Sequence, residues 1–114
     1  MNAREANVIL RQKARAELSK FRRHLLSQSQ QTVLDHAYEY ATKSDMVTII
    51  HETEFTLAEA KALLSRPGLL DAIFKEYGNH SSNSMDVLVS FISDKAEEYA
   101  NTLQSTRLRN SGNR

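Results

Sequence analysis

Hydrophobic residues recur every three or four positions along most of this chain, the spacing that places side chains on one face of an α-helix. The first such stripe comprises Ala3, Ala6, Leu10, Ala14, Leu18, Phe21 and Leu25. No proline or glycine interrupts it, so the pattern predicts one helix from Ala3 to about Leu26. Such a helix measures about 36 Å, whereas a compact domain of this length has a radius of gyration of about 13 Å. We therefore expect the first helix to span the whole body or to project from it, and projection favours self-association.

The segment after this helix carries two weaker patterns. A polar interruption at 27–31 contains Ser29, a candidate cap for the helix that follows. The second stripe comprises Val33, Leu34, Ala37, Tyr38 and Ala41. Residues 43–45 then predict a break, with Ser44 or Asp45 as the cap of a new helix. The apolar run at 46–50 is rich in β-branched residues, but the chain offers no second strand to pair with it, so we interpret it as a buried helical turn.

Residues 54–77 carry the firmest structural signals. Thr56 and Glu59 form a capping box, in which each side chain satisfies the free backbone amide of the other residue at a helix start. Two apolar stripes follow, comprising Leu57, Ala60, Leu63 and Leu64, then Leu69, Leu70, Ile73, Phe74 and Tyr77. Between them, Pro67 disfavours helical geometry in the residue before it, and Gly68 tolerates a left-handed turn. The pattern predicts two helices that reverse sharply and pack as a core hairpin.

A last helix is expected from Met85, after a loop dense in capping residues at 79–84. Its buried face comprises Leu88, Ile92, Ala96, Tyr99 and Leu103. Beyond residue 106 the chain is polar and rich in residues that break helices. We therefore predict a single helical domain over 1–106 and a disordered tail over 107–114.

Composition favours an all-α fold. The 114 residues include three Gly and one Pro, too few for the many turns of a β-sandwich or barrel. We predict a compact bundle of about five helices, of which the first is long and basic. The chain has no cysteine and no apolar run near the ~20 residues of a membrane span. Its first residues carry charge but no apolar segment follows them, so we expect no secretory signal. We expect a cytoplasmic protein with no membrane role.

The net charge of +1 conceals an uneven distribution. Residues 1–26 hold seven Lys or Arg against two Glu, whereas residues 35–78 hold eight acids against four bases. The seven cations of the first helix are Arg4, Arg11, Lys13, Arg15, Lys20, Arg22 and Arg23. The arginines at 4, 11, 15 and 22 are seven, four and seven apart, so they line one face, and the other three lie nearby. These seven side chains are the candidate surface for a partner.

Several partners fit a basic helix. The cations form an adequate electrostatic footprint for a nucleic-acid backbone, but the same residues also fit a solvated face, or one that docks on this protein's own acidic middle or on a partner's acidic surface. The hairpin at 54–77 superficially resembles a helix-turn-helix, but its second helix offers Asp71, Lys75 and Glu76 and too many apolar residues to leave a free reading face. We expect a protein partner, with nucleic acid bound by the four aligned arginines as the alternative.

No constellation in the sequence indicates catalysis, a metal or a cofactor. His36 and Glu39 share a helix face, but zinc needs three or four ligands and no array such as His-Glu-x-x-His is present. Three glycines are too few for phosphate-cradling loops, and no serine lies in a nucleophile-elbow motif. We expect a non-enzymatic interaction protein, and a small hydrolase or transferase with an unrecognised site is the remaining alternative.

The capping and packing residues also carry a family resemblance. They are Thr56, Leu57, Ala60, Lys61, Ala62, Leu63, Leu64, Pro67, Leu70, Tyr77, Met85, Asp86, Ile92 and Ala96. Over about residues 32–98 the chain resembles a family of short bacterial proteins, classed as domain of unknown function 3848. The resemblance implies a bacterial protein associated with mobile elements, and it brings no catalytic or binding residues. Gly68 after the proline and the length of the basic first helix depart from the family's pattern.

Overall fold

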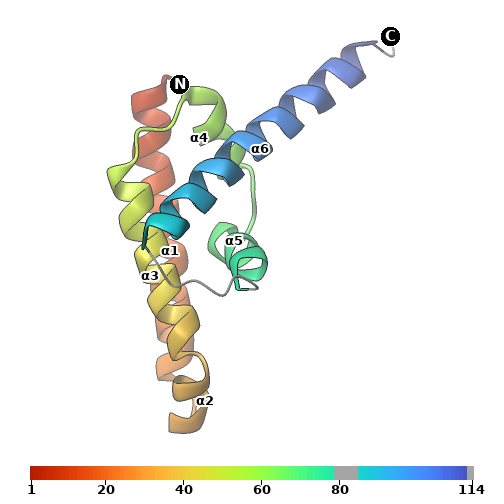
Figure 1. The fold of residues 1–114 in the computed structure, drawn as a ribbon. Helices are drawn as coiled ribbons and strands as arrows, with labels where there is room; N and C mark the ends of the chain where they lie inside the picture. The colour runs from red at the N-terminus through yellow and green to blue at the C-terminus, as the bar shows by residue number, and fades with distance from the viewer. Residues whose placement is uncertain (79–84, 113–114) are drawn as a thin grey trace.

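The hydrophobic stripes of the sequence become helices in the structure, a computed structural model (Figure 1). It describes residues 1–78 and 85–112, with side chains as far as residue 104. Within these residues the helices are α1 (Ala3–Leu26), α2 (Gln30–Asp35), α3 (Ala37–Glu52), α4 (Leu57–Leu64), α5 (Leu69–Tyr77) and α6 (Met85–Gly112). The same residues contain no strand, so the predicted all-α fold is confirmed.

The long first helix organises the bundle. α1 packs along α3, and short α2 closes this pair at one end (Figure 1). α4 packs against α1 near the N-terminus, α6 crosses α4, and α5 fills the space between α1, α3 and α6. The closed end of the α1–α2–α3 pair and the C-terminal end of α6 both extend from the body. With these projecting ends, the molecule measures 55 × 29 × 27 Å along its principal axes.

Helix starts follow the capping signals. Ser29 Oγ accepts a hydrogen bond from the backbone N–H of Thr32 at 3.2 Å, at the start of α2. The capping box of α4 is complete, since Thr56 Oγ1 accepts from the N–H of Glu59 at 3.1 Å and Glu59 Oε1 accepts from the N–H of Thr56 at 3.0 Å. Gly68 adopts φ +60° at the reversal between α4 and α5, a left-handed conformation that favours glycine. These three predictions are confirmed.

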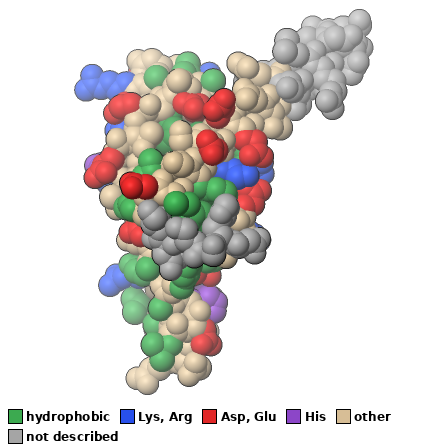
Figure 2. Space-filling model, viewed as in Figure 1, with side chains coloured by type: hydrophobic (Ala, Val, Ile, Leu, Met, Phe, Trp, Pro, Cys, Tyr) green, Lys and Arg blue, Asp and Glu red, His purple; other side chains and the backbone are tan. Residues whose placement is uncertain are grey.

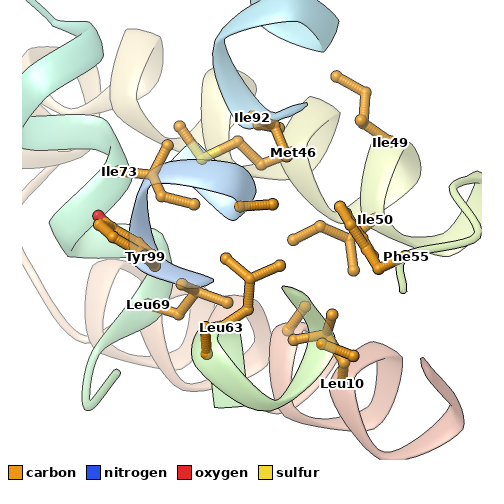
Figure 3. Packing of buried hydrophobic residues seen from close by; sticks show 14 of the residues in the cluster. Leu10, Met46, Ile49, Ile50, Phe55, Leu63, Leu69, Ile73, Ile92 and Tyr99 are labelled. Atoms are coloured by element: carbon orange, nitrogen blue, oxygen red, sulfur yellow. The ribbon is translucent and has the colours of Figure 1, made fainter. Parts of the chain in front are cut away.

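The hydrophobic core lies where five of the helices meet. Its largest fully buried apolar side chains are Leu10, Met46, Ile50, Leu63, Leu69, Leu70, Ile73 and Ile92. Figure 3 shows such side chains converging from α1, α3, α4, α5 and α6, with Leu63 of α4 near the middle. Both helices of the 54–77 hairpin bury their stripes, so the prediction that it is core scaffold is confirmed.

The predicted break at residues 43–45 is wrong, because α3 runs without interruption from Ala37 to Glu52. The side chain of Lys43 is 3% exposed, and its ammonium group forms ion pairs with Glu39, one turn earlier, and with Asp71 of α5. Ser44 and Asp45 therefore lie inside a helix, and the run at 46–50 is its buried second half. Serine and aspartate often cap helix starts, so the sequence alone predicted the start of this helix near residue 44, several residues after its actual start at Ala37.

The actual boundary is at His36. Its backbone N–H donates to the carbonyl oxygens of Thr32 and Val33, and its ring Nδ1 lies 2.9 Å from the same Thr32 oxygen. These bonds close α2 and let α3 start in a new direction. The chain thus forms six helices in its described part, one more than the five predicted.

The second predicted stripe is mostly a surface feature. Leu34 is 69% exposed and Tyr38 41% exposed, and Leu26 at the adjoining end of α1 is 67% exposed. Leu26 and Leu34 belong to the helix ends that meet where α1, α2 and α3 join, whereas the ring of Tyr38 lies 5.9 Å from the ring of Phe74 on α5. Apolar periodicity correctly predicted helices here but not which face is buried.

Two further expectations concern the last helix and its ends. Leu88, Ile92, Ala96 and Tyr99 are buried along one face of α6, as predicted. The backbone of α6 is helical to Gly112, past the predicted domain end at residue 106, and the disorder of the tail over 107–114 stays a prediction. The predicted loop at 79–84 lies outside the described residues.

One buried polar side chain joins α1 to the link between α3 and α4. Asn7 on α1 is 1% exposed, and its Nδ2 donates to the carbonyl oxygen of Phe55 at 2.9 Å while its Oδ1 accepts from the N–H of Phe55 at 3.1 Å. The same Nδ2 donates to the Ala3 oxygen at 2.8 Å. The link between α3 and α4 is therefore held to α1 by the Asn7 amide, which bonds both the N–H and the carbonyl of Phe55.

Candidate functional site

The arginines at positions 11 and 15 turn toward the C-terminal end of α3. Arg11 Nη2 donates to Glu54 Oε1 at 2.9 Å and to the oxygen of Thr53 at 3.4 Å. Arg15 Nη2 lies 2.9 Å from Nδ1 of His51. Two of the four aligned arginines thus bind this protein's own middle segment, and Glu54 balances the charge of Arg11.

The lysines of α1 lie on the other edge, facing α5. Lys13 Nζ is 3.1 Å from Glu17 Oε2, and Glu17 accepts hydrogen bonds from the backbone N–H groups of Leu69 and Leu70 at 3.1 and 2.8 Å. These are the first two amides of α5, which have no partner within the helix. The Glu17 carboxylate satisfies them and interacts favourably with the helix dipole, so it docks α5 onto α1.

The predicted surface is therefore divided. Arg11 and Arg15 face α3, whereas Lys13 and Lys20 face α5. Of the seven candidate cations, four are exposed and form neither an ion pair nor a side-chain hydrogen bond with another described residue: Arg4, Lys20, Arg22 and Arg23. They are the part of the candidate surface that remains available to a partner.

Between these two edges α1 presents an outward face, which we call the outer seam. It consists of Ile9, Gln12, Ala16, Ser19, Arg23 and Leu26, spaced alternately three and four residues apart and all exposed. The two ends of the seam are apolar, with Ile9 41% exposed and Leu26 67% exposed. The side chains of Ala16 and Ser19 near its middle are small. α1 lies behind the other helices in Figure 1. The exposure of all six seam residues shows that no described helix covers this face. Figure 2 shows the opposite side of the molecule, on which Asp and Glu side chains gather.

A second feature is a cavity of about 360 Å³ between α1, α3 and α5. Its walls include Lys20, Phe21, His24, Lys43 and Asp71. Lys43 Nζ lies 2.6 Å from Glu39 Oε2 and 4.0 Å from the centre of the Phe21 ring, and it also contacts the Asp71 carboxylate. The lysine is thus engaged by the protein on several sides and is not presented to a ligand as a nucleophile or a free charge.

Three side chains of the described residues have shifted pKa values, and burial or an ion pair explains each shift. Burial raises the pKa of the Tyr77 hydroxyl, and it also raises that of Tyr99, against the opposing effect of the nearby Arg66 guanidinium. A hydrogen bond to Glu76 raises the pKa of Lys95 despite partial burial, and Glu98 adds to the effect. None of these groups lies in the cavity beside Lys43, so the shifts do not indicate a catalytic centre there.

The histidine considered as a metal ligand has a structural role. His36 terminates α2, while Glu39 binds Lys43, so the two side chains are not directed at a common point. Among the residues that the structure describes, no three His, Cys, Asp or Glu side chains are arranged to hold a metal ion. In the same part of the chain, no helix is long and apolar enough to cross a membrane.

A family model matches residues 6–100, from the first turn of α1 to the middle of α6. Its description is "protein of unknown function (DUF3848)". The chain belongs to this family. The match confirms the resemblance found over 32–98 and extends it to most of α1, so the basic helix is part of the DUF3848 domain. No match to the chain was found among curated proteins or among solved structures.

Three polar residues of this DUF3848 protein were not singled out by the sequence. Asn7, Glu17 and Lys43 each bind a segment distant in the chain. Asn7 and Lys43 interrupt otherwise regular stripes by standing at positions that helical spacing assigns to the buried side. That interruption is the signal that could have identified them, but it gives no information on their partners.

Proposed function

We propose that this protein is a cytoplasmic, non-enzymatic module that binds another protein through the outward side of α1. The observation that carries the proposal is the mixture of side chains there. Arg4, Lys20, Arg22 and Arg23 are exposed without ion pairs among the described residues, and the same helix also exposes the apolar side chains of Val8, Ile9 and Leu26. The lack of cysteine fits a cytoplasmic setting.

This mixture favours a protein over nucleic acid. A nucleic-acid backbone is bound by a dense array of cations and gains little from apolar side chains. On α1, Arg11 is paired with Glu54, so a phosphate would have to compete with an existing ion pair. Protein interfaces instead combine an apolar centre with a charged rim, and arginine is enriched in them.

The test is affinity purification with the full-length chain as bait, in a bacterial lysate, carried out in parallel with and without nuclease. We expect a co-purifying protein that survives nuclease and moderate salt, and that is lost with the triple variant Arg4→Glu, Arg22→Glu, Arg23→Glu. The matched control is the double variant Lys61→Glu, Lys75→Glu, which reverses exposed cations on α4 and α5. Retention only of nucleic acid, falling steeply with salt, would replace this proposal by the nucleic-acid alternative.

A further inference from the structure

The outer seam has the spacing of a coiled-coil interface. Helices that pair along their length place one residue in contact after three positions and the next after four, which defines the a and d positions of a heptad. Residues 9, 12, 16, 19, 23 and 26 follow this alternation over almost the whole of α1. No described helix covers the seam, although the body already covers the other sides of α1.

The flanks of the seam carry charge of one sign. In the same heptad, the g positions are Val8, Arg15 and Arg22, and the e positions are Lys13, Lys20 and Ser27. Four of these six residues are cations and none is an acid. In coiled coils the e and g residues meet the corresponding residues of the partner and decide which partner is accepted. A basic set on both flanks therefore selects a helix with acidic residues at its own e and g positions.

The centre of the seam sets the shape of the partner. Ala16 and Ser19 are small, so a second helix can approach α1 closely there and insert larger apolar side chains. Ile9 and Leu26 provide apolar contacts at the two ends. Arg23 adds a cation within the seam itself, which further disfavours a basic partner.

We propose that α1 binds an amphipathic helix that carries apolar residues at a and d and Asp or Glu at e and g. This inference rests on the proposed function and specifies the partner's chemistry. Pairing of α1 with the α1 of a second copy is disfavoured, because it brings the four flanking cations of each chain against those of the other. A second copy that bound the seam with its acidic side would contradict this proposal, and so would nucleic acid bound there.

The experiment measures binding of two synthetic helical peptides by fluorescence anisotropy. Both have three heptads with Leu at a and d, and they differ only in having Glu or Lys at e and g. We expect the Glu peptide to bind the full-length protein at least about tenfold more tightly than the Lys peptide, a difference of about 1.4 kcal/mol. Added salt should weaken the binding, since the flanking cations Arg15, Lys20 and Arg22 are exposed, whereas Lys13 is half-buried and paired with Glu17.

Variants of the protein then locate the site. Ala16→Gln places a longer side chain in the centre of the seam while keeping helix propensity, and we expect it to weaken binding of the Glu peptide about tenfold. Ala58→Gln, at an exposed alanine of α4, should leave binding unchanged. The double variant Lys20→Glu, Arg22→Glu should reduce the preference for the Glu peptide or reverse it. Lys61→Glu with Lys75→Glu is its control.

The opposite results overturn the inference. Equal affinity for the two peptides, or binding that Ala16→Gln leaves intact, would exclude an acidic helix on the seam. A dimer in light scattering that Ala16→Gln abolishes would assign the seam to a second copy, and an unlabelled DNA duplex that displaces the Glu peptide at lower concentration would assign it to nucleic acid. If neither peptide binds while a lysate protein still depends on Arg4, Arg22 and Arg23, the proposed function stands and the helical partner does not.

Discussion

Polar side chains that are buried or half-buried specify how distant segments of this protein meet. Asn7, Glu17 and Lys43 lie on helices, yet each binds a group that follows much later in the chain: the 53–56 link, the first amides of α5 and Asp71. A buried donor or acceptor without a partner costs about 1–3 kcal/mol, so these side chains penalise any packing in which their partners are absent. The apolar core supplies most of the driving force, and these few polar contacts select the arrangement.

The Asn7 clamp gives the sharpest prediction at this scale. Asn7→Ala leaves both the N–H and the carbonyl of Phe55 without partners in a buried site, so we expect the free energy of unfolding to fall by about 2–4 kcal/mol. Asn7→Asp should also destabilise, because a carboxylate oxygen then faces the Phe55 and Ala3 carbonyls in place of the amide donor. Urea denaturation followed by circular dichroism measures both changes.

The matched control for these variants is Asn101→Ala, at an exposed position of α6. Alanine has the higher helix propensity, so this change should leave stability unchanged or slightly raised. Equal stability of Asn7→Ala and the parent protein would show that water can replace the amide, and the clamp would then have no energetic role.

At the scale of helices, the sequence predicted well wherever a local signal acts within a few residues. The extent of α1, the capping box of α4 and the turn at Gly68 depend on residues that touch one another along the chain. The continuity of α3 is not signalled locally in this way. Lys43, in the middle of α3, is paired with Asp71, which lies on another helix and 28 residues later in the chain. The exposure of Leu34 and Tyr38 is likewise unpredictable locally, since it depends on which helix lies opposite.

The same division applies to the candidate site. The sequence predicted the exposed cations Arg4, Lys20, Arg22 and Arg23 because a charged, solvated face has a simple helical period. It could not assign Arg11 to Glu54, which requires knowing that α1 and the end of α3 are neighbours.

The continuity of α3 can be tested with proline. Ser44→Pro removes a backbone donor and introduces a steric clash in the middle of a helix, so we expect a loss of at least about 3 kcal/mol of stability or failure to fold. If residues 43–45 were a helix start instead, proline near that position would be tolerated. Gln30→Pro is the control, because residue 30 is the first position of α2 after its Ser29 cap and its N–H has no helical partner. Thermal unfolding of the two variants separates these cases.

At the scale of the whole molecule, the shifted pKa values predict sensitivity to alkaline pH. Folding raises the pKa of Tyr77, Tyr99 and Lys95, so the folded protein holds these protons more tightly than the unfolded chain. The stability linked to them is fully present below the unfolded values, about 10 for tyrosine and about 10.4 for lysine. It is lost as pH rises through the folded values, because the unfolded chain releases these protons first. We expect the free energy of unfolding to decrease steadily above about pH 10.

Tyr77→Phe isolates one contribution to this decrease. The ring of Tyr77 packs against Phe91 with the ring centres 5.2 Å apart, and phenylalanine can keep that contact while removing the ionisable group. The variant should therefore lose less stability than the parent between neutral and alkaline pH, measured by urea titration at each pH. Tyr40→Phe, on a half-buried ring of α3, controls for the loss of a hydroxyl alone. Identical pH profiles for Tyr77→Phe and the parent would contradict the prediction.

The contact between Asn7 and Phe55 also has a consequence for the order in which the protein is made. The two residues are 48 positions apart, so α1 is synthesised long before the segment that satisfies its buried amide. At about 5–20 residues per second, a ribosome needs about 2–10 s to add that segment, and α4 and α5, which also pack against α1, come later still. During this interval the nascent chain carries a basic amphipathic helix with its future core face uncovered, and that helix is available to chaperones before the rest of the domain exists.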